Sequence, residues 1–144
     1  MLTLEFGKTR KIFSFDFEFP LIQHRSIART AGVDSATIKA KAKDLELNFE
    51  IEERELKLAK CIIKYPDVLT RVLDELLMHG LCDYIYLLST TFTDFYDRCY
   101  CVEKDKTTGE ILQINYRRIL LCEATANVLK QCFDILGIQP LERM

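Results

Sequence analysis

Residues 81–99, LCDYIYLLSTTFTDFYDRC, decide the fold class of this chain. Their apolar side chains recur at steps of three or four and are Leu81, Ile85, Leu88, Phe92, Phe95 and Cys99. Such spacing places all of them on one face of an α-helix. Because an apolar helix face is stable only when it packs against other elements, the segment predicts a structure built from packed helices.

Two further segments show helical periodicity. Residues 65–80, YPDVLTRVLDELLMHG, have Pro66 in a first turn and Gly80 at the far end, both suited to a helix. Their apolar stripe consists of Val68, Leu69, Val72, Leu73, Leu76 and Leu77. A third helix, over residues 116–136, ends at Gly137, and its stripe consists of Leu121, Thr125, Val128, Cys132 and Ile135. We predict that these three helices form the core of an all-α bundle.

Weaker patterns surround these helices. Residues 52–64, EERELKLAKCIIK, predict another helix, and residues 45–52, LELNFEIE, an extended connector. Residues 24–44 predict two short helical pieces separated at Gly32, with Asp34 capping the second. Residues 102–115, VEKDKTTGEILQIN, are interpreted as a charged loop that turns at Thr108 and Gly109.

The N-terminal residues 1–20 differ from the rest. In KIFSFDFEFP, residues 11–20, every second residue from Phe13 to Phe19 is a phenylalanine, the two-residue period of a strand. Either this segment packs loosely on the bundle or reflects a gene boundary, or it pairs with a strand of a partner. We therefore divide the chain into an irregular or extended segment, 1–20, and a helical domain, 21–144.

Composition narrows the functional class. The 144 residues suit one globular domain, and no apolar run approaches the roughly 20 residues of a membrane span. The start lacks the pattern of a signal peptide, so we predict a cytoplasmic protein. The net charge is −2, from 20 basic and 22 acidic residues. Any polyanionic partner must therefore be bound by a local basic patch and by stacking.

The six cysteines do not predict a metal centre or a disulfide framework. Cys61, Cys82, Cys122 and Cys132 lie in apolar helical stretches, where a thiol behaves as a small core side chain. Cys99 and Cys101 are separated by one residue, and no second pair of ligands follows at zinc spacing, so we expect packed thiols, with redox chemistry and a metal site as the alternatives. His24 and His79 likewise have no nucleophile or metal partner at a recognisable spacing.

Residues 24–32, HRSIARTAG, and 81–144 resemble the C-terminal anticodon-binding domain of cytoplasmic, animal-type arginyl-tRNA synthetase. The markers are Arg-Ser-Ile-Ala-Arg, Phe-x-x-Phe-Tyr-x-x-Cys, Leu-Leu-Cys-Glu-Ala and the terminal Glu-Arg-Met. The resemblance extends from Arg25 to Met144. It implies a helical bundle of the class I synthetase anticodon-binding type.

The resemblance also implies RNA-binding residues. Met144 would pack against an unstacked anticodon base, Arg143 would reach a phosphate or base edge, and Tyr96 would offer a stacking ring. Tyr96 adjoins the apolar stripe, so a position at the edge of the core is the alternative. Arg25 and Arg29 could face phosphates or could be solvated or paired with glutamates. Arg117, Arg118 and Lys130 could extend the patch or form an exposed helix face.

The chain departs from the family just before the Arg-Ser-Ile-Ala-Arg segment. Where the family usually has a tyrosine and, four residues later, an arginine, this chain has Phe19 and Gln23, with Pro20 between them. Proline breaks a helical turn. Phe19 retains a ring for stacking, but the charged side chain is missing, which predicts micromolar or weaker RNA binding.

The resemblance implies that the complete enzyme uses ATP and arginine on a separate catalytic domain. This chain has neither a His-x-Gly-His-like turn nor a Lys-Met-Ser-Lys-like loop, so we expect it to bind no cofactor and to be inactive alone. The expected partner is the anticodon arm of arginine tRNA, with other synthetases or the enzyme's own catalytic domain as further candidates. DNA and membranes are not expected partners. The alternative is a non-catalytic helical scaffold for protein-protein interaction.

Overall fold

The computed structural model describes residues 20, 26–27, 30–43, 52–105 and 108–138. Its helices are α2 (Ser35–Lys43), α3 (Glu53–Ile63), α4 (Tyr65–Glu75), α5 (His79–Arg98) and α6 (Tyr116–Leu136). Two short strands, β1 (Val102–Lys104) and β2 (Ile111–Ile114), connect α5 to α6. The helical fold class is therefore confirmed. None of the helices in this part of the chain is long and apolar enough to span a membrane.

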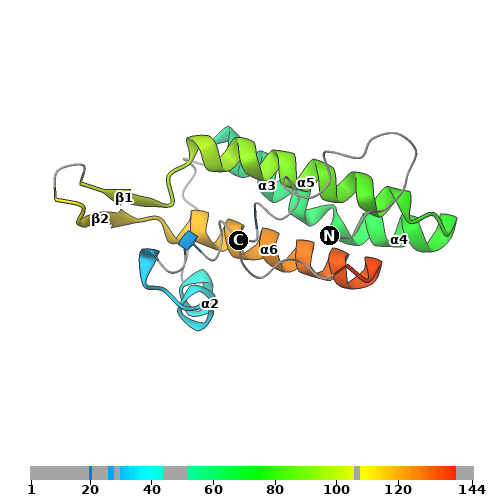
Figure 1. Ribbon diagram of the computed structural model, residues 1–144, viewed down its shortest axis with the longest axis horizontal. Helices are drawn as coiled ribbons and strands as arrows, with labels where there is room; N and C mark the ends of the chain where they lie inside the picture. Colours follow the sequence, from blue (N-terminus) through cyan, green and yellow to red (C-terminus); the bar gives the residue numbers. More distant parts are fainter. Residues whose placement is uncertain (1–19, 21–25, 28–29, 44–51, 106–107, 139–144) are drawn as a thin grey trace.

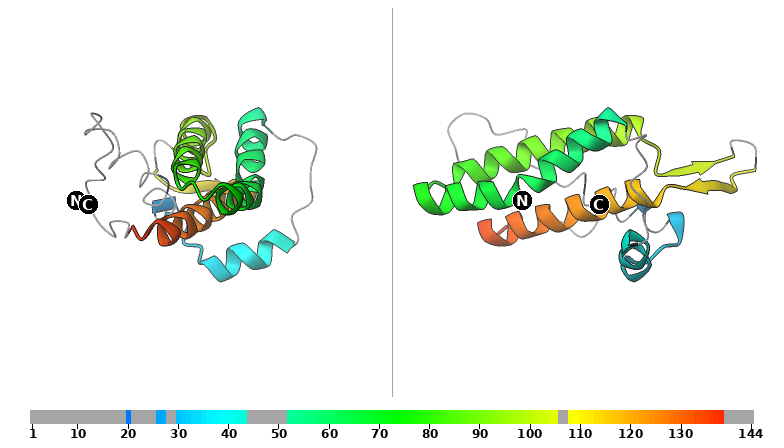
Figure 2. Two further views of the ribbon diagram at one scale, coloured as in Figure 1. Left: turned by 90° about the vertical axis from the view of Figure 1, so that its right-hand side faces the viewer. Right: turned by 180° about the vertical axis from the view of Figure 1, so that it is seen from behind.

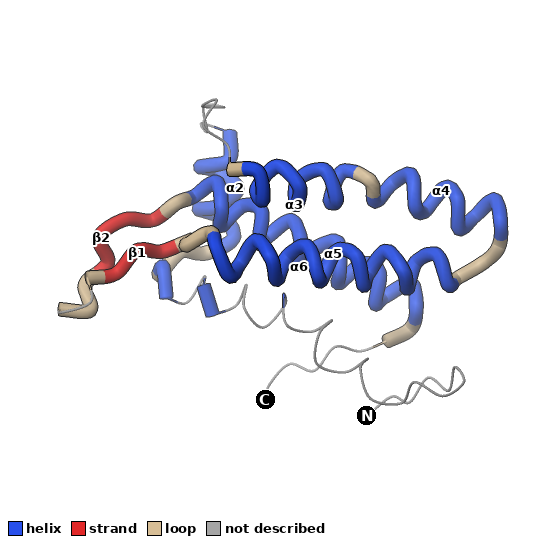
Figure 3. The backbone as a smooth tube through the Cα atoms, turned by 90° about the horizontal axis from the view of Figure 1, so that it is seen from above, coloured by secondary structure: helices blue, strands red, loops and turns tan. Residues whose placement is uncertain are grey.

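The helices α3, α5 and α6 pack against one another along the long axis of the molecule (Figure 1). The helix α4 follows α3 after a short break and extends the same row, as Figure 3 shows from above. Seen along the bundle, α2 lies outside it and packs against α6 (Figure 2, left). The hairpin of β1 and β2 projects beyond one end of the bundle.

The predicted stripe of α5 forms the centre of the core. All six of its side chains are buried, and Leu81, Leu88, Phe92 and Phe95 have no exposed surface. Leu58 of α3 is equally buried in the same core. The prediction from residues 81–99 is therefore confirmed, because the observed burial follows the three- and four-residue spacing.

The helix α4 contributes less to the core than its stripe predicts. Val72 is buried, but Leu73 and Leu76 are 73% and 82% exposed. The helix also ends at Glu75, because Leu76 adopts a left-handed backbone with φ of 53°. Gly80 is consequently not a helix end and lies in the first turn of α5. The prediction of one continuous helix to residue 80 was wrong, since periodicity does not reveal where a chain turns back.

The helix α6 buries a face that differs from the predicted one. Of the predicted stripe, Thr125 and Cys132 are buried, whereas Leu121 and Val128 are half-buried and Ile135 is 46% exposed. The apolar side chains buried on α6 are Ile119, Cys122, Ala126, Leu129, Cys132 and Phe133. The predicted end is confirmed, because Gly137 closes the helix with a left-handed φ of 69°.

Residues 102–115 form an antiparallel hairpin, which corrects the prediction of a charged loop. Val102 pairs with Ile114 and Glu103 with Gln113, and a register irregularity follows Glu103. The turn itself is as predicted, because Gly109 has a φ of 73°. Strands of three and four residues are too short to show a period of two among charged residues.

The segment before the bundle agrees with its sequence. Gly32 has a left-handed φ of 63°, and Asp34 Oδ1 accepts a hydrogen bond from Thr37 N at 2.9 Å. Asp34 therefore caps α2 as predicted. The Phe-rich stretch 11–19 and most of the predicted connector, 45–51, lie outside the described residues.

The cap of α6 provides a first prediction. Asn115 Oδ1 accepts a hydrogen bond from Arg118 N at 3.2 Å, which satisfies one free donor of the first turn. We expect Asn115→Ala to lower the free energy of unfolding by about 1 kcal/mol. Asn115→Ser keeps a capping oxygen and should lose much less. Urea denaturation of both variants measures the difference, and equal losses would contradict a capping role.

Candidate nucleic-acid interface

A cavity of about 200 Å³ lies where the end of α5, strand β1 and the segment around Ser26 meet. Its lining residues are Ser26, Ile27, Thr30, Tyr96, Cys99, Tyr100, Cys101, Val102 and Lys104. The first three belong to the Arg-Ser-Ile-Ala-Arg segment or follow it directly, and Tyr96 belongs to the Phe-x-x-Phe-Tyr-x-x-Cys motif. The fold therefore brings two of the sequence markers together around one space.

The wall of the cavity is formed by the turn from α5 into β1. Cys99 takes an extended backbone after Arg98, and its N–H donates to the carbonyl of Phe95 at 2.8 Å. Tyr100 then leaves the helix axis with a side chain that is 69% exposed, whereas Cys101 is buried. This turn places an aromatic ring and the start of β1 beside Tyr96.

Tyr96 is half-buried and lines this cavity. Its ring stacks on that of Phe92, with centroids 6.0 Å apart and an interplanar angle of 16°. Burial raises the pKa of the Tyr96 phenol, so the side chain stays uncharged near neutral pH. Tyr96 therefore borders the core, as the alternative predicts, and also faces a cavity, while its contact with RNA stays a prediction.

The other predicted contact residues lie outside the described part of the chain. These are Phe19, Arg25, Arg29, Arg143 and Met144. Arg25 and Arg29 are the sequence neighbours of Ser26 and Thr30, which line the cavity. Their contacts with RNA stay predictions.

The direction of α6 limits how the carboxyl terminus could reach Tyr96. The hairpin joins α5 to α6, so the two helices run antiparallel and α6 ends far from the hairpin (Figure 1). A helix of 21 residues is about 30 Å long, and the eight residues after Leu136 could span about 27 Å if fully extended. Met144 can therefore contact Tyr96 only if the chain after α6 turns back toward the hairpin.

A cluster of ionic groups contacts the turn that forms the cavity wall. Glu55 is 1% exposed, and its two carboxylate oxygens accept from Arg117 Nε at 2.8 Å and Arg118 Nε at 2.6 Å. Arg118 also donates to the backbone carbonyl of Tyr100 at 2.9 Å and lies 3.5 Å from Glu52. This network connects the start of α3, the start of α6 and the turn that borders the cavity.

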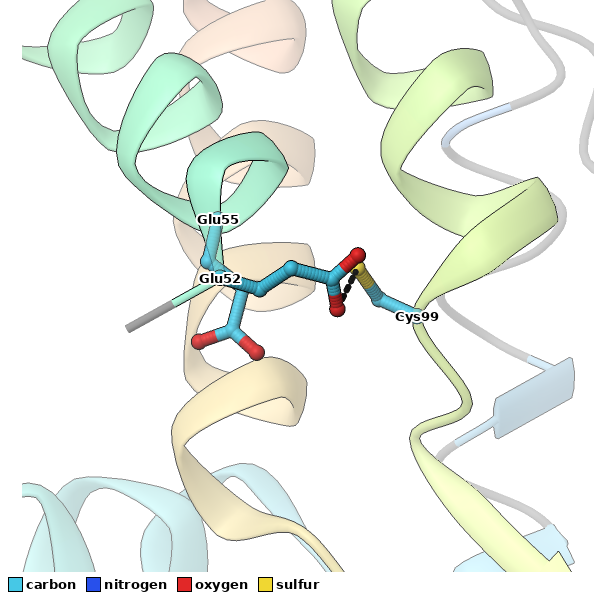
Figure 4. Close-up of side chains that lie close together, drawn as sticks. All are labelled: Glu52, Glu55 and Cys99. Carbon is cyan, nitrogen blue, oxygen red and sulfur yellow. Dashed lines mark hydrogen bonds between the residues drawn. The ribbon is translucent and has the colours of Figure 1, made fainter. Parts of the chain in front are cut away.

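The atoms of Glu52, Glu55 and Cys99 also approach one another closely, within 4.8 Å (Figure 4). Oxygen and sulfur donors at this separation can bind a divalent cation. Here, however, the Cys99 thiol donates to Glu52 at 3.2 Å, while both Glu55 oxygens accept from arginines. Burial, followed by this hydrogen bond, raises the pKa of Cys99 to about 12. These features describe an ion-pair cluster better than a metal centre.

Arg117 and Arg118 are therefore structural residues, and neither the predicted basic patch nor an exposed helix face describes them. Their side chains are 27% and 19% exposed because they extend toward the buried Glu55. Glu55 precedes them by more than 60 positions, so no local pattern indicates the pairing. An acidic residue on the apolar face of a predicted helix, near Leu58, was the only signal available. Lys130 is exposed, as predicted for a solvated face.

The sequence is similar to those of known proteins. Residues 22–144 match the family model described as the DALR anticodon binding domain. The cytoplasmic arginine–tRNA ligases of Xenopus tropicalis and Homo sapiens are 53% and 52% identical to this chain over 120 residues. A probable cytoplasmic arginine–tRNA ligase of Drosophila melanogaster is 46% identical over 119 residues. Each alignment covers 83% of this chain and 18% of the relative.

The chain thus spans about a fifth of the length of these relatives, which all carry the name cytoplasmic. The resemblance inferred from the Arg-Ser-Ile-Ala-Arg and Phe-Tyr motifs is confirmed by the family match and by the level of identity. Because that match covers most of its length, this chain belongs to the DALR anticodon binding domain family.

Proposed function

We propose that this chain recognises the anticodon arm of arginine tRNA and that, in a full-length arginyl-tRNA synthetase, it supports ATP-dependent attachment of arginine. The observation that carries the proposal is the cavity at Tyr96 in a chain of the anticodon binding family. ATP and arginine would bind to the catalytic part of such an enzyme. Binding energy at this domain would then select the tRNA.

The chemistry of the cavity suits a base that has left its stack. Single-stranded loops are read by aromatic rings that stack on splayed bases and by polar groups that reach base edges. Tyr96 offers a neutral ring held in place by Phe92, while the hydroxyl groups of Ser26 and Thr30 can donate or accept hydrogen bonds. A tyrosine fixed before binding loses little side-chain entropy when a base stacks on it.

Phosphate contacts would come from a few local cations. Lys104 is exposed and lines the cavity, and the further proposed cations are Arg25 and Arg29, which precede Ser26 and Thr30 in the sequence. A net charge of −2 provides no general attraction for RNA. We therefore expect a shallow dependence of log K on log salt, since each phosphate contact contributes a slope of about −0.7 to −0.9.

The test replaces Tyr96 and measures tRNA binding by fluorescence titration. Base stacking on an aromatic ring contributes about 1–3 kcal/mol, so Tyr96→Ala should weaken binding of arginine tRNA by roughly 5- to 150-fold. Tyr96→Phe keeps the ring and should bind nearly as well as the parent. Tyr86→Ala, a half-exposed tyrosine elsewhere on α5, is the matched control and should also bind normally.

Two outcomes would overturn the proposal. Equal affinity for arginine tRNA and a noncognate tRNA would remove the case for anticodon recognition. Undiminished binding by Tyr96→Ala would show that the cavity is not the RNA site. The first result would favour the alternative, a helical scaffold that contacts other synthetases or a catalytic domain.

A further inference from the structure

Two thiols meet beside the cavity. Cys101 lies between α5 and β1, Cys122 lies in the second turn of α6, and their sulfur atoms are 3.7 Å apart. Both are free thiols, and their exposed fractions are 6% and 0%. A disulfide needs a sulfur separation of about 2.05 Å, so a shift of less than 2 Å would join them.

The surroundings give the two thiols different chemical roles. The hydrogen bond with Cys122 lowers the pKa of Cys101, and the positive charge of Arg118 acts in the same direction, against burial and the negative charge of Glu55. The same hydrogen bond, together with burial, raises the pKa of Cys122. Because Cys101 also lines the cavity and Cys122 does not, we assign Cys101 as the nucleophile and Cys122 as the thiol that resolves its oxidised form, an arrangement found in redox-sensitive pairs.

The cavity gives a small oxidant access to Cys101. Cys101 lines it together with the exposed residues Tyr100 and Lys104, whereas Cys122 is not among the lining residues. Cys99 lines the same cavity, but its thiol donates to Glu52 and its pKa is raised to about 12, which keeps it protonated. Of the thiols that the structure describes, Cys101 thus combines access with activation.

We propose that Cys101 and Cys122 form a redox site that a hydroperoxide converts into a reversible disulfide. The Cys101 thiolate attacks one oxygen of hydrogen peroxide and the O–O bond breaks. Hydroxide is the leaving group, and Cys101 becomes a sulfenic acid. The Cys122 sulfur then attacks Cys101, and the hydroxyl group leaves with the Cys122 proton as water. In total, two thiols lose two hydrogen atoms and one hydrogen peroxide becomes two water molecules.

The disulfide would tie the base of the hairpin to α6 along the wall that also contains Tyr96. Arg118, which binds Tyr100, already joins these elements through hydrogen bonds. Oxidation would thus add a covalent link at a place where the fold is held by the ionic cluster. The proposal rests on the two thiols and not on the RNA function.

The experiment treats the full chain with hydrogen peroxide and maps its cysteines by mass spectrometry without reduction. We expect a mass lower by two hydrogen atoms, a peptide that links Cys101 to Cys122, and full reversal by dithiothreitol. Cys122→Ser should instead leave a sulfenic acid on Cys101 that dimedone traps. Cys132→Ser changes another buried thiol of α6 and should form the disulfide at the parent's rate.

The site assignment is overturned if the linked peptides contain other cysteines. It is also overturned if the oxidised chain gains oxygen without forming a link, or if Cys99 is trapped as fast as Cys101 in the Cys122→Ser variant. Circular dichroism of each variant verifies that it is folded. The result on the unaltered chain stands independently of any substitution.

Discussion

Glu55→Gln should lower the free energy of unfolding by about 3 kcal/mol, because it leaves two arginine side chains without their shared anion. The Glu55 carboxylate is 1% exposed and binds Arg117 and Arg118 through separate oxygens. Glutamine has nearly the same shape, so the loss isolates the charge and one acceptor. Removal of one partner of a buried pair leaves charges that water reaches only in part, which makes such losses large.

Asp94→Asn is the matched control for Glu55→Gln in urea denaturation. Asp94 also faces two cations, with Arg54 Nε at 3.5 Å and Lys57 Nζ at 4.0 Å, but its side chain is 48% exposed. We expect a change within about 1 kcal/mol, since exposed ion pairs contribute little. If Glu55→Gln lowered the free energy of unfolding by no more than Asp94→Asn does, the buried cluster would not stabilise the fold.

A second consequence of the cluster concerns the cavity. Arg118 donates to the carbonyl of Tyr100, so the ion pair with Glu55 fixes the turn that borders Tyr96. The ion-pair cluster of Glu55, Arg117 and Arg118 is thus distinct from the residues proposed to bind RNA. The two groups are connected at the backbone carbonyl of Tyr100. Two arginines of this net-acidic domain thus have a structural role, which leaves other basic residues for the proposed RNA site.

The buried residues of α5 could be predicted from the sequence because its apolar side chains all lie on one face of the helix. The stripe from Leu81 to Cys99 is buried throughout. On α4 and at its C-cap the same kind of pattern misleads, since Leu73 and Leu76 are exposed. Periodicity shows that a face is apolar, whereas burial depends on how far the neighbouring elements reach.

The site was predictable only in part, for a different reason. Tyr96 was found through the family motif, and its position beside Phe92 made a role at the core edge equally apparent. Ser26 and Thr30 line the same cavity as Tyr96, although 66 positions separate Thr30 from Tyr96 in the chain. Only the fold brings them together. The pairing of Glu55 with Arg118 also links distant positions. Such contacts arise from packing and have no local signature.

Phe92→Ala should have an effect of similar or larger size, a loss of about 3–5 kcal/mol in the free energy of unfolding. Phe92 has no exposed surface and packs at the centre of the core with Phe95, at a centroid distance of 6.0 Å. Its removal leaves a cavity that rigid helices fill only partly. Because Tyr96 stacks on Phe92, the variant should also release the ring proposed to contact RNA.

Phe133→Ala separates these two effects. Phe133 is 5% exposed and lies on α6, so its loss should destabilise the protein by a comparable amount. Measured well below both melting temperatures, Phe133→Ala should bind arginine tRNA like the parent, whereas Phe92→Ala should bind it more weakly. Equal affinities for the two variants would mean that Phe92 stabilises the core without orienting Tyr96. A stacked partner that fixes the ring before binding would then have no part in recognition, because the ring would reach the base equally well from a loosened position.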